Sequence, residues 1–89
     1  YSFEYYFMNS DKSADVVYQY AVTNLDETYK DMENAAILEE EKHNISDYSV
    51  SASDYYCRVL KKENTVLYVT AYHDSEDEAK SIIKELGYK

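Results

Sequence analysis

Apolar positions in the second half of the chain predict a hairpin followed by a helix. The segments "DYYCRVL" (54–60) and "TVLYVTAY" (65–72) are rich in β-branched and aromatic residues, which favour strands. The polar "KKEN" between them indicates a three-residue connection that ends at Asn64 in the left-handed conformation. This register pairs Cys57 with Val69 and Val59 with Leu67. It predicts one apolar sheet face, made of Tyr55, Cys57, Val59, Leu67, Val69 and Ala71.

The helix is expected over residues 76–86. Its apolar stripe repeats at i, i+3, i+4 and i+7, and consists of Ala79, Ile82, Ile83 and Leu86. Gly87, the only glycine, stands where a helix ends in the left-handed conformation, so that Tyr88 can fold back on Ile83. The preceding "YHDSEDE" is typical of a helix start, with Asp74 or Ser75 as N-cap and a capping box from Ser75 to Glu78.

The first half fits two interpretations. "SFEYYFM" (2–8) predicts a strand, but residues 14–25 suit a strand or a helix, since Val17, Ala21 and Leu25 are spaced at four. A shift of fifty residues aligns 4–30 on 54–80 without gaps and matches seven identical residues in 27 pairs. This apparent repeat favours a strand over 14–25 and a helix from about 24 to about 43.

The pattern therefore predicts one α+β domain over residues 1–89, built from internal repeat units 1–44 and 51–89. Each unit is ββα, and the two together make a four-stranded antiparallel sheet with both helices on one face. If residues 14–25 are helical instead, the alternative is a βαβββα order or a ferredoxin-like α/β plait.

An open, tyrosine-rich sheet face follows from this arrangement. Uncovered sheet faces usually carry Thr, Lys and Glu, whereas Tyr, Met and Arg are enriched in interface cores. The chain has 12 tyrosines. The predicted partner-binding residues on the open face are Tyr6, Tyr18, Tyr20, Tyr56, Arg58, Tyr68 and Tyr72, with Met8 and Leu60 among them.

Charge narrows the classes of partner. Eighteen Asp and Glu against nine Lys and Arg give a net charge of −9, with −7 in residues 1–44 (three Lys, ten Asp and Glu). Such a balance repels phosphate backbones, so nucleic acid is not an expected partner. No apolar run reaches the ~20 residues of a membrane span. The start at Tyr1 without Met indicates a processed domain, which we expect to be exported, in the bacterial cell envelope or outside the cytoplasm.

The chain holds few candidates for chemistry. His73, Asp74 and Ser75 are adjacent in sequence, which argues against a catalytic triad because neighbouring side chains on a strand diverge. The acidic run beside them lacks the alternation and the Gly of a calcium loop. Cys57 is expected in the core. No catalytic residue, metal site or cofactor is therefore predicted.

The sequence favours a non-enzymatic binding domain whose tyrosine face meets a protein partner or a second copy of the chain. Two alternatives remain at this point. One is a carbohydrate or small-ligand platform, on which flat rings stack against the ligand. The other is an acidic inhibitor that mimics a polyanion and whose binding collapses with added salt.

Overall fold

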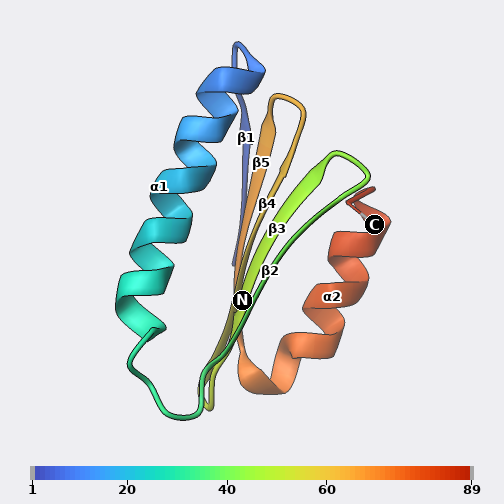
Figure 1. Ribbon diagram of the computed structural model, residues 1–89. Coiled ribbons are helices and arrows are strands. Elements are labelled where there is room, and N and C mark those ends of the chain that lie inside the picture. Colours follow the sequence, from blue (N-terminus) through green and yellow to red (C-terminus); the bar gives the residue numbers. More distant parts are fainter. Residues whose placement is uncertain (1, 89) are drawn as a thin grey trace.

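The computed structural model describes residues 2–88 and has an α+β architecture around one antiparallel sheet. The five strands lie in the order β1-β5-β4-β3-β2. The elements, in chain order, are β1 (Ser2–Phe7), α1 (Asp11–Tyr29), β2 (Ala36–Lys42), β3 (Ile45–Ser51), β4 (Tyr55–Lys62), β5 (Thr65–Tyr72), the short 3₁₀ turn η1 (His73–Ser75) and α2 (Glu76–Glu85). Figure 1 shows α1 on one side of the sheet and α2 on the other.

Residues 14–25 are helical, so the predicted strand there is wrong. The side chains of α1 that lie inward recur with the helical period and are Ala14, Tyr18, Ala21, Val22 and Leu25. Ser10 provides the start signal, since its Oγ accepts a hydrogen bond from the Ser13 amide at 3.1 Å. The β-branched residues of the segment are outweighed by this amphipathic period and the cap.

The expected helix over about 24–43 is also wrong, because β2 occupies its second half. Residues 36–42 ("AILEEEK") pair with β3 along their whole length. Residues 45–51 form β3, which was not predicted as a strand either. With β2 and β3 in place of the strand expected over 14–25, the sheet has five strands instead of the predicted four. The observed order βαββββα contains one strand more than the alternative βαβββα order.

The internal duplication is not confirmed. An offset of fifty residues sets α1 against a segment that includes β5, so the matched positions have different secondary structure. Tyrosine and valine occur both in strands and in half-buried helices. Identical residues at matched positions therefore did not indicate the same secondary structure.

Both faces of the sheet are covered, which corrects the prediction of two helices on one face. The β4–β5 hairpin has a two-residue turn at Glu63 and Asn64, so Cys57 pairs with Thr70 and Val59 with Tyr68. A one-residue change of register moves a strand's side chains to the opposite face. The predicted single apolar face is thereby divided between the two sides of the sheet.

Each helix packs on its own hydrophobic core. The residues buried beneath α1 come from β3, β4 and β5, and are Tyr48, Val50, Cys57, Val59 and Val66. Those beneath α2 come from β4 and β5, and are Tyr56, Leu60, Leu67, Val69 and Ala71. Ala79 and Ile83 are the buried residues of α2 itself. The resulting three layers leave mainly the edges of the sheet and the outer sides of the helices exposed.

The C-terminal end of α2 has the predicted geometry, whereas its N-terminal end does not. Gly87 adopts φ 90°, and the Tyr88 amide donates to the Ile83 carbonyl at 3.4 Å, as predicted for the C-terminal end. The Ser75 side chain makes no capping hydrogen bond, so the predicted capping box is wrong. Instead, the 3₁₀ turn η1 connects the end of β5 directly to the first turn of α2.

Candidate interaction surface

The predicted tyrosine face is dispersed over three parts of the molecule. Tyr18 is 3% exposed and belongs to the buried stripe of α1, whereas Tyr20 is 71% exposed on the outer side of the same helix. Tyr56 and Arg58 are buried beneath α2. The remaining predicted residues, Tyr6, Tyr68 and Tyr72, share the α1 side of β1 and β5. Tyr68 is partly buried against the core under α1, and Tyr72 lies six residues along β5 from Val66, the partner of Tyr6.

Arg58 is committed to the interior. Its Nε and Nη2 donate to the two carboxylate oxygens of Asp47 at 2.9 and 2.6 Å, and its Nη1 donates to Tyr56 Oη at 3.1 Å. Burial alone would lower the pKa of the Arg58 guanidinium, but the hydrogen bonds and charge of Asp47 raise it. The side chain is therefore a charged internal link and presents no free guanidinium to a partner.

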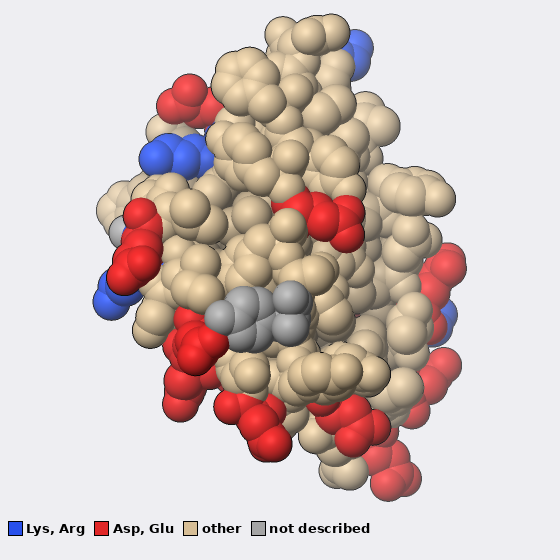
Figure 2. Space-filling model, turned by 180° about the vertical axis from the view of Figure 1, so that it is seen from behind, with Lys and Arg blue, Asp and Glu red and all other residues tan. Residues whose placement is uncertain are grey.

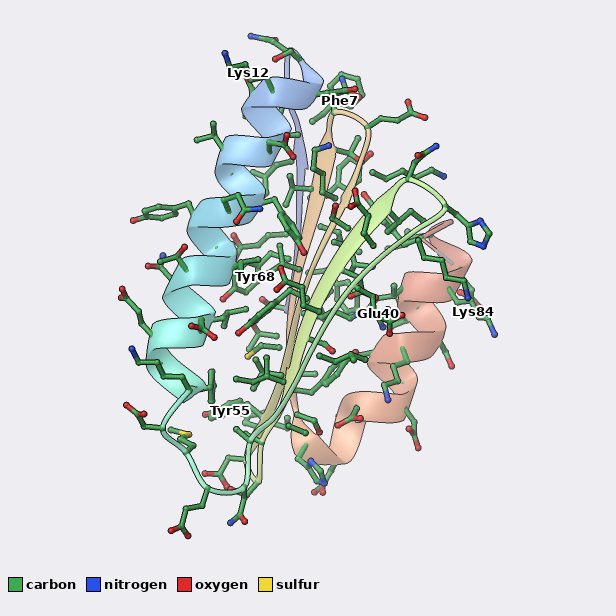
Figure 3. The ribbon with its side chains drawn as sticks, viewed as in Figure 1. Phe7, Lys12, Glu40, Tyr55, Tyr68 and Lys84 are labelled. Carbon is green, nitrogen blue, oxygen red and sulfur yellow. The ribbon has the colours of Figure 1, made fainter. Side chains whose placement is uncertain are left out.

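Exposed aromatic side chains gather instead along β1. Tyr5 is 58% exposed and Phe7 74% exposed, both on the α2 side of the strand, and Tyr6 projects from the α1 side. At the other end of the strand, the exposed rings of Tyr55 and Tyr72 stack with centroids 5.6 Å apart. Figure 3 shows Tyr55 and Tyr68 on the side of the sheet that faces α1, and Phe7 near the end of β1.

Sequence reasoning found Tyr6 on this surface but missed Tyr5, Phe7 and Tyr55. The signal was present in "SFEYYF", a strand of six residues with aromatic rings on both sides and one charge, Glu4. What the pattern could not supply was the position of this strand at an edge of the sheet. That position follows from pairing with β5, sixty residues along the chain.

The two edges of the sheet differ strongly in charge. β2 carries Glu39, Glu40, Glu41 and Lys42 in succession, whereas Glu4 is the one charged residue of β1. Proteins commonly protect edge strands with charged side chains, which prevent unwanted pairing. Figure 2, seen from the side of β1, shows acidic side chains gathered toward the lower and lateral margins around a broad area with few charges. β2 has the usual protection and β1 does not.

Backbone groups of β1 also point outward. In antiparallel pairs, residues that bond to the neighbouring strand alternate with residues whose N–H and C=O point away from it. The Met8 amide donates to the Asn64 carbonyl at 2.8 Å, which sets the phase of this alternation. Counting back, Tyr6 bonds toward β5, and the N–H and C=O of Tyr5 and Phe7 are directed outward. Within residues 2–88, no strand lies on that side.

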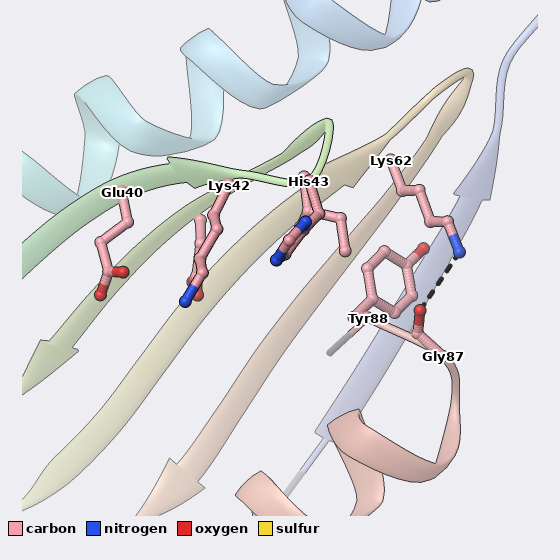
Figure 4. A pocket seen from close by; sticks show the side chains of 8 residues that line it. Glu40, Lys42, His43, Lys62, Gly87 and Tyr88 are labelled. Carbon is pink, nitrogen blue, oxygen red and sulfur yellow. Dashed lines mark hydrogen bonds between the residues drawn. The ribbon is translucent and has the colours of Figure 1, made fainter.

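A cavity of about 440 Å³ lies between the β2–β3 hairpin and the end of α2. Figure 4 shows Lys62 opposite the hairpin, with its Nζ donating to the Gly87 carbonyl at 3.2 Å. The lining is mixed in charge and comprises Glu40, Lys42, His43, Ile45, Asp47, Lys62, Gly87 and Tyr88. Two charged residues of this lining already have partners. Asp47 accepts hydrogen bonds from Arg58, and Lys62 donates to the Gly87 carbonyl.

The residues around "YHDSEDE" connect α2 to the sheet. Glu76 accepts hydrogen bonds from Ser51 Oγ at 2.7 Å and from Lys80 Nζ at 2.9 Å, and His73 Nδ1 lies 3.9 Å from its carboxylate. Burial raises the pKa of Glu76, but these hydrogen bonds outweigh it and the pKa is lowered. The carboxylate therefore serves as a structural anchor for the first turn of α2.

Cys57 has the environment of a structural thiol. It is buried, and Tyr29 Oη lies 3.8 Å from its Sγ. Burial raises the pKa of the thiol and so disfavours the nucleophilic thiolate. In the described part of the chain, no group of three or more His, Cys, Asp and Glu could hold a metal ion. Neither helix of residues 2–88 is long and apolar enough to cross a membrane.

Comparisons with protein-family models, with curated proteins and with solved structures found no match. The interaction surface is therefore defined by its own geometry: an edge strand with outward backbone groups, exposed aromatic rings on both sides and a single carboxylate.

Proposed function

We propose that this chain is a non-enzymatic protein-interaction domain that binds an extended protein segment at the edge of β1. The observation that carries the proposal is the contrast between the highly charged edge β2 and the aromatic edge β1, which has a single charged residue. An added strand would receive main-chain hydrogen bonds from Tyr5 and Phe7. The aromatic side chains on both sides of β1 would then contact its side chains.

The proposal keeps the protein-binding role expected from the sequence but moves it from the face of the sheet to its edge. Tyr18, Tyr56 and Arg58 no longer belong to the proposed surface, because they are buried. Tyr68 is partly buried against the core under α1. Tyr6 and Tyr72 remain exposed, and Tyr5 and Phe7 join them. Aromatic residues supply much of the binding energy in protein interfaces, which supports a protein as the ligand.

The test is selection from a displayed library of random peptides against the immobilised domain. The decisive variant is Tyr5→Pro. Its missing N–H is the outward one, so the pairing with β5 is kept while the outer edge is blocked. Selected peptides should bind Tyr5→Pro at least about tenfold more weakly than wild type, a difference of 1.4 kcal/mol.

The matched control is Tyr20→Ala, which removes a highly exposed tyrosine from the outer side of α1. Peptide affinity should be unchanged in this variant, and circular dichroism should show both variants folded. Equal binding by wild type and Tyr5→Pro would contradict the proposal. So would the absence of both peptide binding and self-association in the wild-type domain.

The two alternatives receive less support from the described residues. Tyr55 and Tyr72 stack on one another, which leaves fewer free ring faces for a sugar. The acidic alternative draws on Glu39, Glu40 and Glu41 along β2. It predicts binding to a basic partner that weakens steeply with salt, whereas binding at the β1 edge should depend little on salt.

A further inference from the structure

We infer that the segment received by β1 is β1 of a second copy of this chain, which deepens the proposed function and rests on it. The two strands would pair antiparallel about a twofold axis and join two five-stranded sheets into one of ten strands. Such a contact is isologous and closed, because the same surface is used by both copies. Both α1 helices would lie on one side of the joined sheet and both α2 helices on the other.

The register follows from the outward backbone groups. Because Tyr5 points its N–H and C=O away from β5, it can form the central hydrogen-bonded pair with Tyr5 of the second copy. Phe7 then faces Phe3 of the second copy, and apolar rings meet on the α2 side. This register pairs Phe3 to Phe7 of one copy with Phe7 to Phe3 of the other, and it sets Ser2 of each β1 opposite Met8, the residue that follows the other β1.

Hydrogen-bonding side chains face each other in the same register. Glu4 falls opposite Tyr6 of the second copy, on the α1 side of the joined sheet. Within one copy, Tyr6 Oη already donates to the Glu4 carboxylate, so the two side chains have matching chemistry and orientation. The pairing would gather two hydroxyl donors and two carboxylate acceptors into one cluster.

Other pairings are disfavoured by charge. A register centred on Glu4 sets two carboxylates directly opposite each other, which is destabilising. Pairing of β1 with β2 of another copy would bring Glu39, Glu40 and Glu41 against aromatic residues and would give an open-ended assembly. The β1 edge carries one carboxylate per copy, so two molecules of net charge −9 can meet there with few acidic side chains between them.

The first measurement is the mass of the wild-type domain by sedimentation equilibrium up to about 0.5 mM, where association with a Kd near 100 μM is visible. We expect the mass to double with concentration and the dimer to be favoured by added salt, because salt screens the remaining acidic repulsion. A wild-type domain that stays monomeric overturns the inference. If that monomer still binds selected peptides at β1, the proposed function stands; if it binds none, both fail.

The second measurement tests the register with a pair of substitutions at Tyr6, which is exposed in one copy. Tyr6→Lys sets an ammonium opposite Glu4 of the second copy, and the dimer should be retained and become weaker with salt. Tyr6→Glu sets two carboxylates together, twice by symmetry, and the dimer Kd should rise at least tenfold. Equal effects of the two substitutions would overturn the register.

Cross-linking provides an independent distance. In the inferred register, the Cα atoms of the two Tyr5 residues lie about 5.5 Å apart, within disulfide range. The two Phe7 residues lie about 13 Å apart along the strands. Mild oxidation should therefore cross-link Tyr5→Cys and leave Phe7→Cys and wild type uncross-linked, since Cys57 is buried. Cross-linking of Phe7→Cys as readily as Tyr5→Cys would overturn the inference.

Discussion

At the scale of single residues, one non-glycine residue of the β4–β5 turn has an unfavourable backbone conformation. Glu63 occupies the β4–β5 turn with φ 54°, a conformation that costs an L-residue roughly 1–2 kcal/mol. Its position was assigned from sequence to a three-residue turn with Asn64 in the left-handed conformation. Asn64 instead donates from Nδ2 to the Met8 carbonyl at 2.8 Å, and this long-range contact has no local sequence signal.

The turn offers a simple test of this strain. Glu63→Gly should raise the free energy of unfolding by about 0.5–1 kcal/mol, because glycine adopts positive φ freely but is more flexible in the unfolded chain. The control is Glu63→Ala, which keeps the strained conformation and should change little. Chemical denaturation of the three proteins measures the difference; a Gly variant no more stable than the Ala variant would refute the strain.

The Arg58–Asp47 pair is the strongest internal electrostatic contact described. Arg58→Met leaves the Asp47 carboxylate without its bidentate partner in a largely buried site and should lower the free energy of unfolding by about 3–5 kcal/mol. The matched control is Lys61→Met. Lys61 pairs with an Asp15 carboxylate that is mostly exposed, so its loss should cost about 1 kcal/mol or less. Urea unfolding that gives equal losses would show that Arg58 is not a structural link.

At the scale of elements, short-range patterns predicted β1, β4, β5 and α2, misassigned α1 and β2, and missed β3. The helical spacing of Ala79 and Ile83 and the Gly87 stop both indicate a helix, which is why α2 was found. Of the predicted stripe, Ala79 and Ile83 are buried, whereas Leu86 is 54% exposed. In α1, valines and tyrosines favour a strand while the buried positions follow a helical period. In β2, three successive glutamates suit a solvated helix, yet their strand pairs with β3 at the sheet edge. Packing and strand pairing with distant residues decided both cases, and a short stretch of sequence carries no information about those distant partners.

The candidate surface was predictable in kind but not in place. The abundance of tyrosine indicated exposed aromatic side chains, and Tyr6 and Tyr72 are exposed on the α1 side of the sheet. The face to which they were assigned depended on a hairpin register that was wrong by one residue. Because a one-residue change moves the side chains of a strand to the opposite face, Tyr68 and Tyr72 lie on the face of Cys57 and Val59. Tyr56 and Arg58 lie on the other face and are buried because α2 covers it.

The N-caps of α1 and α2 differ, so removing the side-chain hydroxyl of each should have different effects on stability. Ser10 accepts a hydrogen bond from the Ser13 amide, so Ser10→Ala should lower the free energy of unfolding by about 1 kcal/mol. Ser75 stands at the start of α2 without a side-chain capping bond, and Ser75→Ala should have little effect. Thermal or urea unfolding of the two variants distinguishes them. An equal or larger loss from Ser75→Ala would contradict the assigned caps.

At the scale of the whole molecule, buried tyrosines set an alkaline limit to stability. Burial, with a hydrogen bond to Asp26, raises the pKa of Tyr48 to about 12, and burial raises that of Tyr29 to about 12 as well. Each folded pKa lies above the ordinary value of 10.0, so the neutral form is favoured by folding. This stabilisation is complete below about pH 10 and is lost between pH 10 and 12.

Urea unfolding from pH 9 to 11, together with tyrosinate absorbance, measures this loss. The free energy of unfolding should fall with pH above 10, by at most about 1.4 kcal/mol per pH unit for each such tyrosine. Tyr48→Phe removes one ionisation and should reduce the slope. A slope that is unchanged in Tyr48→Phe would show that this hydroxyl does not titrate with unfolding.

The pairing of β1 with β5 has a consequence for synthesis on the ribosome. Tyr5 and its partner Leu67 are separated by 62 positions (67 minus 5), and translation at 5–20 residues per second takes roughly 3–12 s to cover them. During that interval the emerging "SFEYYF" has no neighbour on either edge. A nascent chain thus exposes the aromatic β1 segment before it contains β5, the strand that pairs with one edge of β1. Chaperones that hold extended aromatic segments are expected to engage this part of the chain first.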